Sequence, residues 1–145
     1  MKNTIEILIA GDFCPIRRTG QAIIEGKSHD MIHDIKEYID SADISVINLE
    51  TPLSLAGEPI EKTGPNIHSD PRCVEFLVKS GFTLTNTANN HIYDFGEEAF
   101  CETMDILDDN KDFEVLPVVA LKYYNTNESV FSLALKTKKE RHNYS

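Results

Sequence analysis

The sequence predicts an α/β fold in which helices pack in layers on a largely parallel sheet. Three observations predict it: short β-branched runs recur along the chain, amphipathic segments separate them, and polar residues follow each run where it ends. Strands that alternate with helices form parallel sheets, because parallel neighbours need a crossover connection. The last part of the chain departs from this pattern and predicts a β-hairpin.

The expected strands are short and mostly apolar. The first, residues 5–10, is a β-branched run that stops just before Asp12, as a buried parallel strand does where it delivers its last residues to a turn. The other expected strands are residues 44–49 and 82–87, with a fourth that begins near Phe113. Ligands bind at the carboxyl ends of strands in open α/β sheets, so the polar residues at these ends are the first candidates for a site.

Between the strands, apolar residues recur at helical spacing. Residues 30–40 place their apolar positions on one face, and Ser28 or Asp30 is available as the N-cap. A later helix has both a start signal, Asp70 followed by proline, and a stop signal, Gly81. The expected helices are residues 21–25, 30–40, 71–80 and 97–109.

Two segments fit neither pattern. Residues 51–66 contain three prolines and two glycines, too many breakers for regular structure, and we interpret them as a rim or lid. From residue 118 the pattern changes to a hairpin that ends near residue 135, and its β-branched and aromatic content would permit it to cover the open sheet edge. We therefore expect residues 1–115 to form one unit and residues 116–145 a hairpin with a polar tail.

Composition excludes several classes of protein. The 24 acidic and 14 basic residues give a formal net charge of −10, which repels nucleic acid, although bound divalent cations would still allow an anionic substrate. Three cysteines without a CxxC pattern predict neither a disulfide framework nor a zinc ribbon. No apolar stretch is long enough for a signal peptide or a membrane span. These features predict a cytoplasmic chain in a reducing compartment, with no membrane segment.

The densest group of chemically active side chains is the run ANNHIYDFG at residues 88–96. His91 can bind a metal or carry a proton, Asn90 offers a neutral oxygen, and Asp94 is near enough to accept a hydrogen bond from the imidazole and fix its tautomer. The alternative is a polar loop that caps the next helix, where Asn and Asp are favoured in any case.

Two further strand ends favour the functional interpretation. Asp12 follows the first expected strand and Glu50 follows the second. Together with Asn90 and His91 they would form an oxygen-rich site with one nitrogen, suited to Mg²⁺, Mn²⁺ or Fe²⁺. Taken singly, Asp12 is more typical of a turn or N-cap and Glu50 of a solvated position. Their coincidence at successive strand ends is what indicates a site.

Other polar residues near these ends have weaker claims. Cys14 is more typical of a small packed residue than of a ligand. His68 is a candidate only because its loop could fold over the site. Arg17 and Arg18 could bind an anionic group near Asp12, although such a pair is more often solvated.

Three stretches, GD at 11–12, ADISVINLETPL at 42–53 and ANNHIYDFG at 88–96, occur here in a distinctive order and spacing. In this they resemble the poly-gamma-glutamate capsule biosynthesis proteins of the CapA type, over roughly residues 5–113. The resemblance implies a calcineurin-like metallophosphoesterase fold, of which this chain would hold the N-terminal half as a partial layer fold.

The resemblance also implies roles for individual residues. Asp12 would be a ligand of a first metal ion, Glu50 would bridge two ions, and Asn90 would bind the second. His91 would face the leaving group or stabilise charge on the phosphoryl oxygen, with Asp94 orienting it. Such sites use a two-metal clamp in which bound water attacks phosphorus in line. The implied partner is a phosphoester substrate or a polyanionic polymer.

The sequence departs from this family in two ways. The family's second-half motifs, which resemble HWG and GHHPH, are missing, and His142 is the only histidine after Phe113. Members are also often membrane-anchored. The sequence is therefore interpreted as a truncated domain and supports two hypotheses: a phosphoesterase-like half-site that a partner chain or a homo-oligomer completes, and a non-catalytic α/β remnant or binding module. Loss of half a sheet should expose apolar surface and favour self-association.

Overall fold

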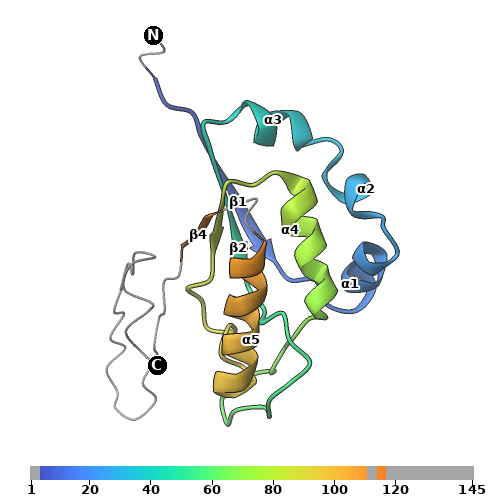
Figure 1. The fold of residues 1–145 in the computed structure, drawn as a ribbon, viewed down its shortest axis with the longest axis vertical. Helices are drawn as coiled ribbons and strands as arrows, with labels where there is room; N and C mark the ends of the chain where they lie inside the picture. Colours follow the sequence, from blue (N-terminus) through green and yellow to red (C-terminus); the bar gives the residue numbers. More distant parts are fainter. Residues whose placement is uncertain (1–3, 111–113, 117–145) are drawn as a thin grey trace.

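A computed structural model describes residues 4–110 and 114–116, and these residues form one parallel sheet with helices beside it. The strands lie side by side in the order β1-β2-β3-β4, and each neighbouring pair is parallel. This arrangement confirms the predicted α/β class (Figure 1). The strands are β1 (Ile7–Phe13), β2 (Ile44–Leu49), β3 (Leu84–Asn86) and β4 (Glu114–Leu116).

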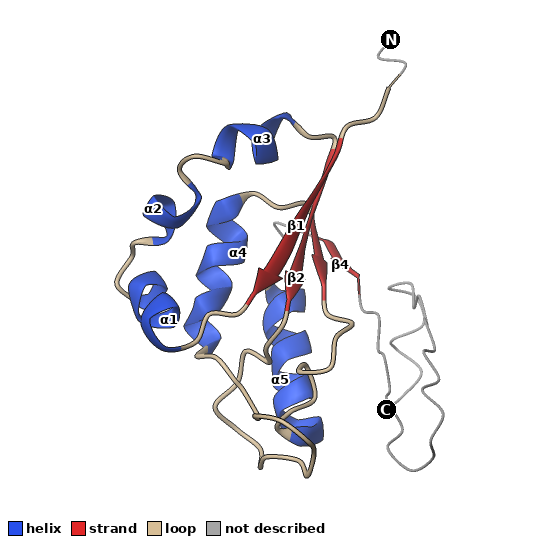
Figure 2. Ribbon diagram, turned by 180° about the vertical axis from the view of Figure 1, so that it is seen from behind, coloured by secondary structure: helices blue, strands red, loops and turns tan. Residues whose placement is uncertain are grey.

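The described helices all lie on one side of the sheet, as both ribbon views show (Figures 1 and 2). Each crossover from one strand to the next therefore covers the same face. The helices are α1 (Arg17–Ile24), α2 (Ser28–Ile32), α3 (Lys36–Ser41), the short 3₁₀ helix η1 (Pro71–Cys73), α4 (Val74–Ser80) and α5 (Gly96–Asp109). Among the residues described, no helix has the length and apolar character needed to cross a membrane.

The core lies between the sheet and these helices. Alternate residues of β2 are buried against the helices, while the others are half-buried on the opposite face, the period of two that a strand imposes. On β1, Ile7 and Ile9 point away from the helices and are largely exposed. The most deeply buried apolar side chains are Ile23, Ile39, Leu49, Leu53, Leu77, Phe82 and Leu107.

A bulge in β1 decides where Asp12 lies. Ile9 is paired with Val46, but Asp12 is paired with Asn48, so two residues of β1 oppose one of β2 between these pairs. One extra residue shifts all later side chains to the other face of a strand. The bulge thus puts Asp12 on the open face with Asn48 and turns Phe13 into the core. The sequence predicts a strand that ends before Asp12, whereas β1 includes it.

The helix signals around α4 are confirmed in detail. Asp70 accepts a hydrogen bond from the Arg72 backbone N–H at 2.9 Å, which satisfies one of the free donors of a helix start. Gly81 ends α4 with φ 79°, in the left-handed region that glycine adopts without strain. Leu77 lies in the core between them.

The predicted helix at residues 30–40 is wrong as a single element. The chain forms α2 and α3 instead, with a turn at His33–Ile35 between them. Ile32 and Ile39 are buried as the periodicity indicates, but Met31 and Ile35 are exposed. The β-branched isoleucines and Asp34 have low helix propensity, so they do not hold one continuous helix.

Further boundaries differ from the sequence prediction, among them those of β3, which spans Leu84–Asn86 and not residues 82–87. Helix α1 starts at Arg17, earlier than the predicted residue 21. The predicted hairpin at 118–135 falls outside the described residues, and so does most of the predicted unit 116–145. The division at residue 115 therefore stays a prediction.

Candidate functional site

A row of polar side chains crosses the carboxyl edge of the sheet. Asp12, Asn48 and Asn86 occupy matching positions on β1, β2 and β3. Asn48 Nδ2 donates to Asp12 Oδ1 at 2.7 Å, and Asn86 Nδ2 donates to Asn48 Oδ1 at 2.6 Å. Parallel pairing in register thus converts three separate strand ends into one connected group, as the sequence predicts for Asp12. The sequence does not single out Asn86, because this residue lies inside the expected strand at 82–87.

Asn89 ties this row to the loop that follows β3. Its Nδ2 donates to the Leu49 carbonyl oxygen at 2.7 Å and lies 3.4 Å from Asn48 Oδ1. Its Oδ1 accepts hydrogen bonds from the backbone N–H groups of His91 and Ile92, both at 3.0 Å. An Asn side chain that binds backbone groups two and three residues ahead fixes a tight turn. Asn89 therefore sets the position of His91 relative to the end of β2.

His91 and Asp94 form the contact that their spacing indicates. His91 Nδ1 lies 2.7 Å from Asp94 Oδ2. The Asp94 side chain is 0% exposed and that of His91 is 15% exposed. A carboxylate behind one ring nitrogen orients an imidazole and defines which nitrogen carries the proton.

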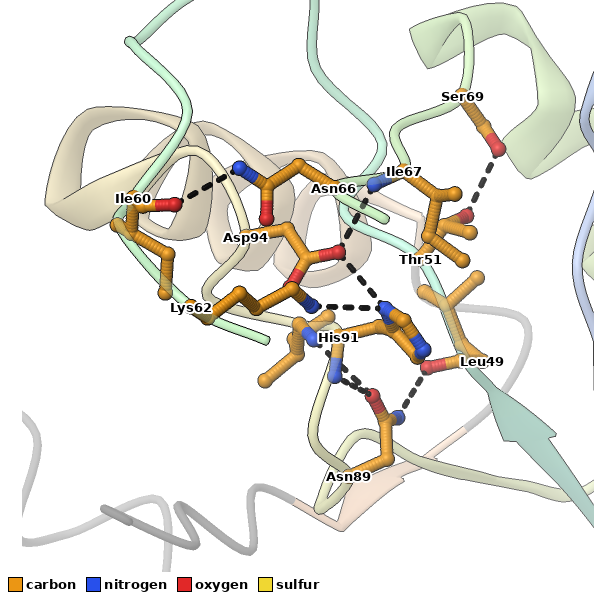
Figure 3. A network of polar contacts seen from close by, with 11 residues as sticks. Leu49, Thr51, Ile60, Lys62, Asn66, Ile67, Ser69, Asn89, His91 and Asp94 are labelled. Carbon is orange, nitrogen blue, oxygen red and sulfur yellow. Dashed lines mark hydrogen bonds and ion pairs between the residues drawn. The ribbon is translucent and has the colours of Figure 1, made fainter. Parts of the chain in front are cut away.

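Lys62 is the third member of this group, and no sequence motif points to it. Its side chain is only 4% exposed, it forms an ion pair with Asp94 Oδ1, and its Nζ lies 3.1 Å from His91 Nδ1 (Figure 3). Asp94 Oδ2 also accepts a hydrogen bond from the Ile67 backbone N–H at 2.8 Å. The buried carboxylate is thereby satisfied on both oxygens, as a charge removed from water must be.

The loop between β2 and η1 is fixed against the 88–96 run at several further points. Ile60 N–H donates to the Asp94 carbonyl oxygen at 2.9 Å. The His68 and Phe95 rings are stacked, with centroids 4.3 Å apart. Gly57 has φ 78°, and a Cβ there would lie 2.1 Å from the Phe95 carbonyl oxygen. In this structure the predicted rim or lid is a wall built onto the site.

Asp12 and Glu50 both lie close enough to Cys14 for their charges to act on its thiol. Burial raises the pKa of the Cys14 thiol, and the negative charges of Glu50 and Asp12 raise that pKa further. A thiolate is disfavoured beside like charge. The backbone agrees, because Glu50 N–H donates to the Phe13 carbonyl oxygen at 3.0 Å. Asp12 and Glu50 therefore flank the start of the loop after β1.

The oxygen atoms at this edge of the sheet are of the type that binds a divalent cation. Carboxylate oxygens from Asp12 and Glu50, with amide oxygens nearby, are what Mg²⁺ and Mn²⁺ prefer. Within residues 4–110 and 114–116, however, no three His, Cys, Asp or Glu side chains gather closely enough to hold an ion. Asn90 is exposed, next to the tightly bonded Asn89. The described residues thus include donors of the type that a divalent cation prefers, but they do not bring them together in a cluster.

The weaker candidates lie outside the bonded network. Arg17 and Arg18 are exposed at the start of α1. His68 packs on Phe95, and its Nδ1 is buried without a hydrogen-bond partner among the described atoms. The thiols of Cys14, Cys73 and Cys101 are free, with Cys73 buried and Cys101 exposed.

The fold and this edge define a class: a parallel α/β domain with an Asp, Asn and His site at the carboxyl ends of its strands. Residues 6–122 match the family model described as bacterial capsule synthesis protein PGA_cap. The match covers most of the 145 residues, and the chain belongs to this family. No curated protein shows significant similarity to the chain.

Proposed function

We propose that this capsule synthesis family member carries a metal-dependent, phosphoesterase-like half-site in capsule or poly-gamma-glutamate biosynthesis. The observation that carries the proposal is the continuous bonded path from Asp12 through Asn48 and Asn89 to the His91–Asp94 pair. Hydrogen bonds along this path would hold the Asp12 carboxylate and the His91 imidazole in fixed positions, as a functional site requires.

The proposed division of roles follows the chemistry of each side chain. Asp12, Glu50 and Asn90 would hold a divalent cation, Mn²⁺, Mg²⁺ or Fe²⁺, with the remaining ligands supplied from elsewhere, for example by a partner chain or a second copy. The cation would supply positive charge to an anionic substrate. His91 would act on the substrate as an acid, base or hydrogen-bond donor, and Asp94 would orient it.

A cation also reconciles the proposed substrates with the charge of the chain. A net charge of −10 repels a phosphoester or a polyanionic polymer. A bound divalent ion is the strongest local charge in its site and reverses that effect over a short range. Binding of such a substrate should therefore depend on the metal.

Thermal unfolding with and without Mn²⁺ tests the proposal. A ligand at about a hundred times its dissociation constant stabilises a folded protein by about 2.7 kcal/mol. The unfolding midpoint of the wild type should rise with Mn²⁺, and those of Glu50→Ala and Asn90→Ala should not. Glu58→Ala, which removes an exposed carboxylate from the same loop, is the matched control and should respond like the wild type.

The second candidate is a non-catalytic binding module. It is favoured by the finding that the described residues do not bring three His, Cys, Asp or Glu side chains together. In that case Mn²⁺ shifts neither the wild type nor the variants, and bis(p-nitrophenyl) phosphate is not hydrolysed under any metal condition. A metal-dependent midpoint with measurable hydrolysis would exclude the module.

A further inference from the structure

Lys62 is in a position that a lysine seldom occupies. A lysine normally keeps its ammonium in water and lays only its stem along the protein, yet the Lys62 side chain is 4% exposed. It enters from the loop between β2 and η1 and points into the pair formed by His91 and Asp94 (Figure 3).

The geometry assigns one proton position on His91. An ionised carboxylate only accepts hydrogen bonds, so the 2.7 Å separation between His91 Nδ1 and Asp94 Oδ2 places the ring proton on Nδ1. With that proton directed at Oδ2, Nδ1 has no lone pair for the ammonium 3.1 Å away. The Lys62 ammonium therefore donates to Asp94 Oδ1, and in a ring that carries a single proton Nε2 is then the acceptor.

Lys62 also determines which way the carboxylate faces. The Ile67 N–H and the imidazole share Oδ2, while Lys62 holds Oδ1. Without the ammonium, Oδ1 would be a buried acceptor with no partner, and the carboxylate would gain by rotating away from the ring.

We propose that Lys62 is a positioning residue: by holding Asp94, it selects the Nδ1–H tautomer of His91 and presents Nε2 to the substrate. The proposal rests on the proposed function, in which His91 faces the phosphoryl group. It adds a residue from the loop between β2 and η1 to a site otherwise built from strand ends and the 88–96 run.

The test is the tautomeric state of His91, measured by long-range ¹H–¹⁵N correlation on the metal-free chain. The sequence has five histidines, so the His91 signals are assigned by their loss in His91→Asn. In the wild type Nδ1 should be protonated and Nε2 bare, and in Lys62→Met the two tautomers should mix. Lys79→Met, which breaks an exposed pair with Glu75, should leave the pattern unchanged.

Two results overturn the proposal. A wild-type His91 that carries its proton on Nε2 contradicts the assigned geometry, and this outcome does not depend on whether Lys62→Met folds. An Nδ1–H tautomer that is unchanged in folded Lys62→Met shows that Lys62 does not position it. If Lys62→Met does not fold, Lys62→Arg replaces it. The planar guanidinium keeps the charge but delivers its donors differently, so the His91 signals should move in the folded variant, and unmoved signals overturn the proposal.

Activity distinguishes failure of this inference from failure of the proposed function. If Mn²⁺ does not raise the unfolding midpoint of the wild type and bis(p-nitrophenyl) phosphate is not hydrolysed, the proposed function fails, while the tautomer measurement still decides the role of Lys62. If the wild type is active, Lys62→Met should lower kcat by about tenfold or more with KM nearly unchanged. It should also keep the Mn²⁺-induced rise in unfolding midpoint. An unchanged kcat overturns the positioning role.

Discussion

The buried ammonium of Lys62 binds the buried carboxylate of Asp94, and this ion pair joins the loop between β2 and η1 to the run that follows β3. Both side chains are removed from water. Each charge depends on the other, because an unpaired ion in the interior loses its hydration without compensation. The pair therefore contributes to the fold and to the site at the same time.

Removing one partner of this pair should destabilise the chain strongly. Lys62→Met leaves the Asp94 carboxylate buried with one oxygen unpaired, and breaking a buried ion pair in this way costs about 3–5 kcal/mol. The double variant Lys62→Met/Asp94→Asn removes both charges and should recover most of that loss. Urea unfolding of the wild type and the two variants measures both effects.

A surface pair provides the control for this experiment. Lys79 and Glu75 are one turn apart on α4, with side chains 55% and 39% exposed. Lys79→Met should cost only about 0.3–0.5 kcal/mol. If Lys62→Met costs no more than this, or if the double variant is as unstable as the single one, the buried pair does not stabilise the fold as described.

Two glycines in the same loop separate backbone strain from close approach. Gly57 and Gly64 both have positive φ, 78° and 97°, and alanine in the left-handed region costs roughly 1–2 kcal/mol. A Cβ at Gly57 would also meet the Phe95 carbonyl oxygen at 2.1 Å, whereas one at Gly64 meets nothing within 4 Å. Gly57→Ala should therefore lower the unfolding midpoint clearly more than Gly64→Ala. Equal losses would mean that the loop can move away from Phe95.

The parts of the fold that sequence predicts best are those with a local cause. The strand at Ile44–Leu49 and the capped helix after Asp70 appear as expected, because strand periodicity and caps act over a few residues. The face on which Asp12 lies depends on a bulge at Ala10 and Gly11. The glycine alone does not predict it, because a glycine at that point is equally typical of a turn after the strand. Around Asp34 the apolar periodicity predicts one helix, but the low helix propensity of these residues breaks it into α2 and α3.

The site residues likewise divide into those that a local pattern predicts and those that depend on contacts between distant segments. Asp94 was a candidate because it stands three residues after His91, and the contact is present. Lys62 could not be identified in this way, because a lysine in a loop rich in proline and glycine is usually solvated. Its burial depends on how residues 51–66 fold back onto the later run, which is a contact between distant segments. The only hint in the sequence is that Lys62 lies in a loop too rich in proline and glycine to form regular structure.

The proximity of Glu50 to Cys14 can be tested by alkylation. The Glu50 charge helps to raise the pKa of the Cys14 thiol, and the thiolate is the species that reacts. In a Cys101→Ser background, Glu50→Gln should lower that pKa and increase the iodoacetamide rate severalfold near pH 8. Glu58→Gln, elsewhere in the loop, should have no effect. Equal rates in the two variants would show that Glu50 lies too far from Cys14 to act on it.

The raised pKa of the Cys73 thiol should make the folded chain less stable at alkaline pH. Burial raises the pKa of its thiol to about 11, from an ordinary value of 9.0. Between these values the unfolded chain releases the thiol proton while the folded chain keeps it. Stability from this group is therefore complete below pH 9 and is lost as pH rises toward 11, by roughly 2–3 kcal/mol. The difference in unfolding free energy between the wild type and Cys73→Ala should shrink over this range, and a constant difference would contradict the assignment.

The face of β1 that residues 4–110 and 114–116 leave exposed should make the chain associate with itself. Ile7 and Ile9 are 59% and 79% exposed, and β1 is an edge strand of the described sheet. An apolar strand with a free edge is a template for pairing with a second copy, and a charge is the usual protection. Light scattering after size exclusion should show a mass that rises with concentration, and Ile9→Lys should reduce that rise. Leu55→Lys, at a side chain that is 65% exposed in the loop after β2, should not. A wild type that stays monomeric at every concentration would mean that this face is covered.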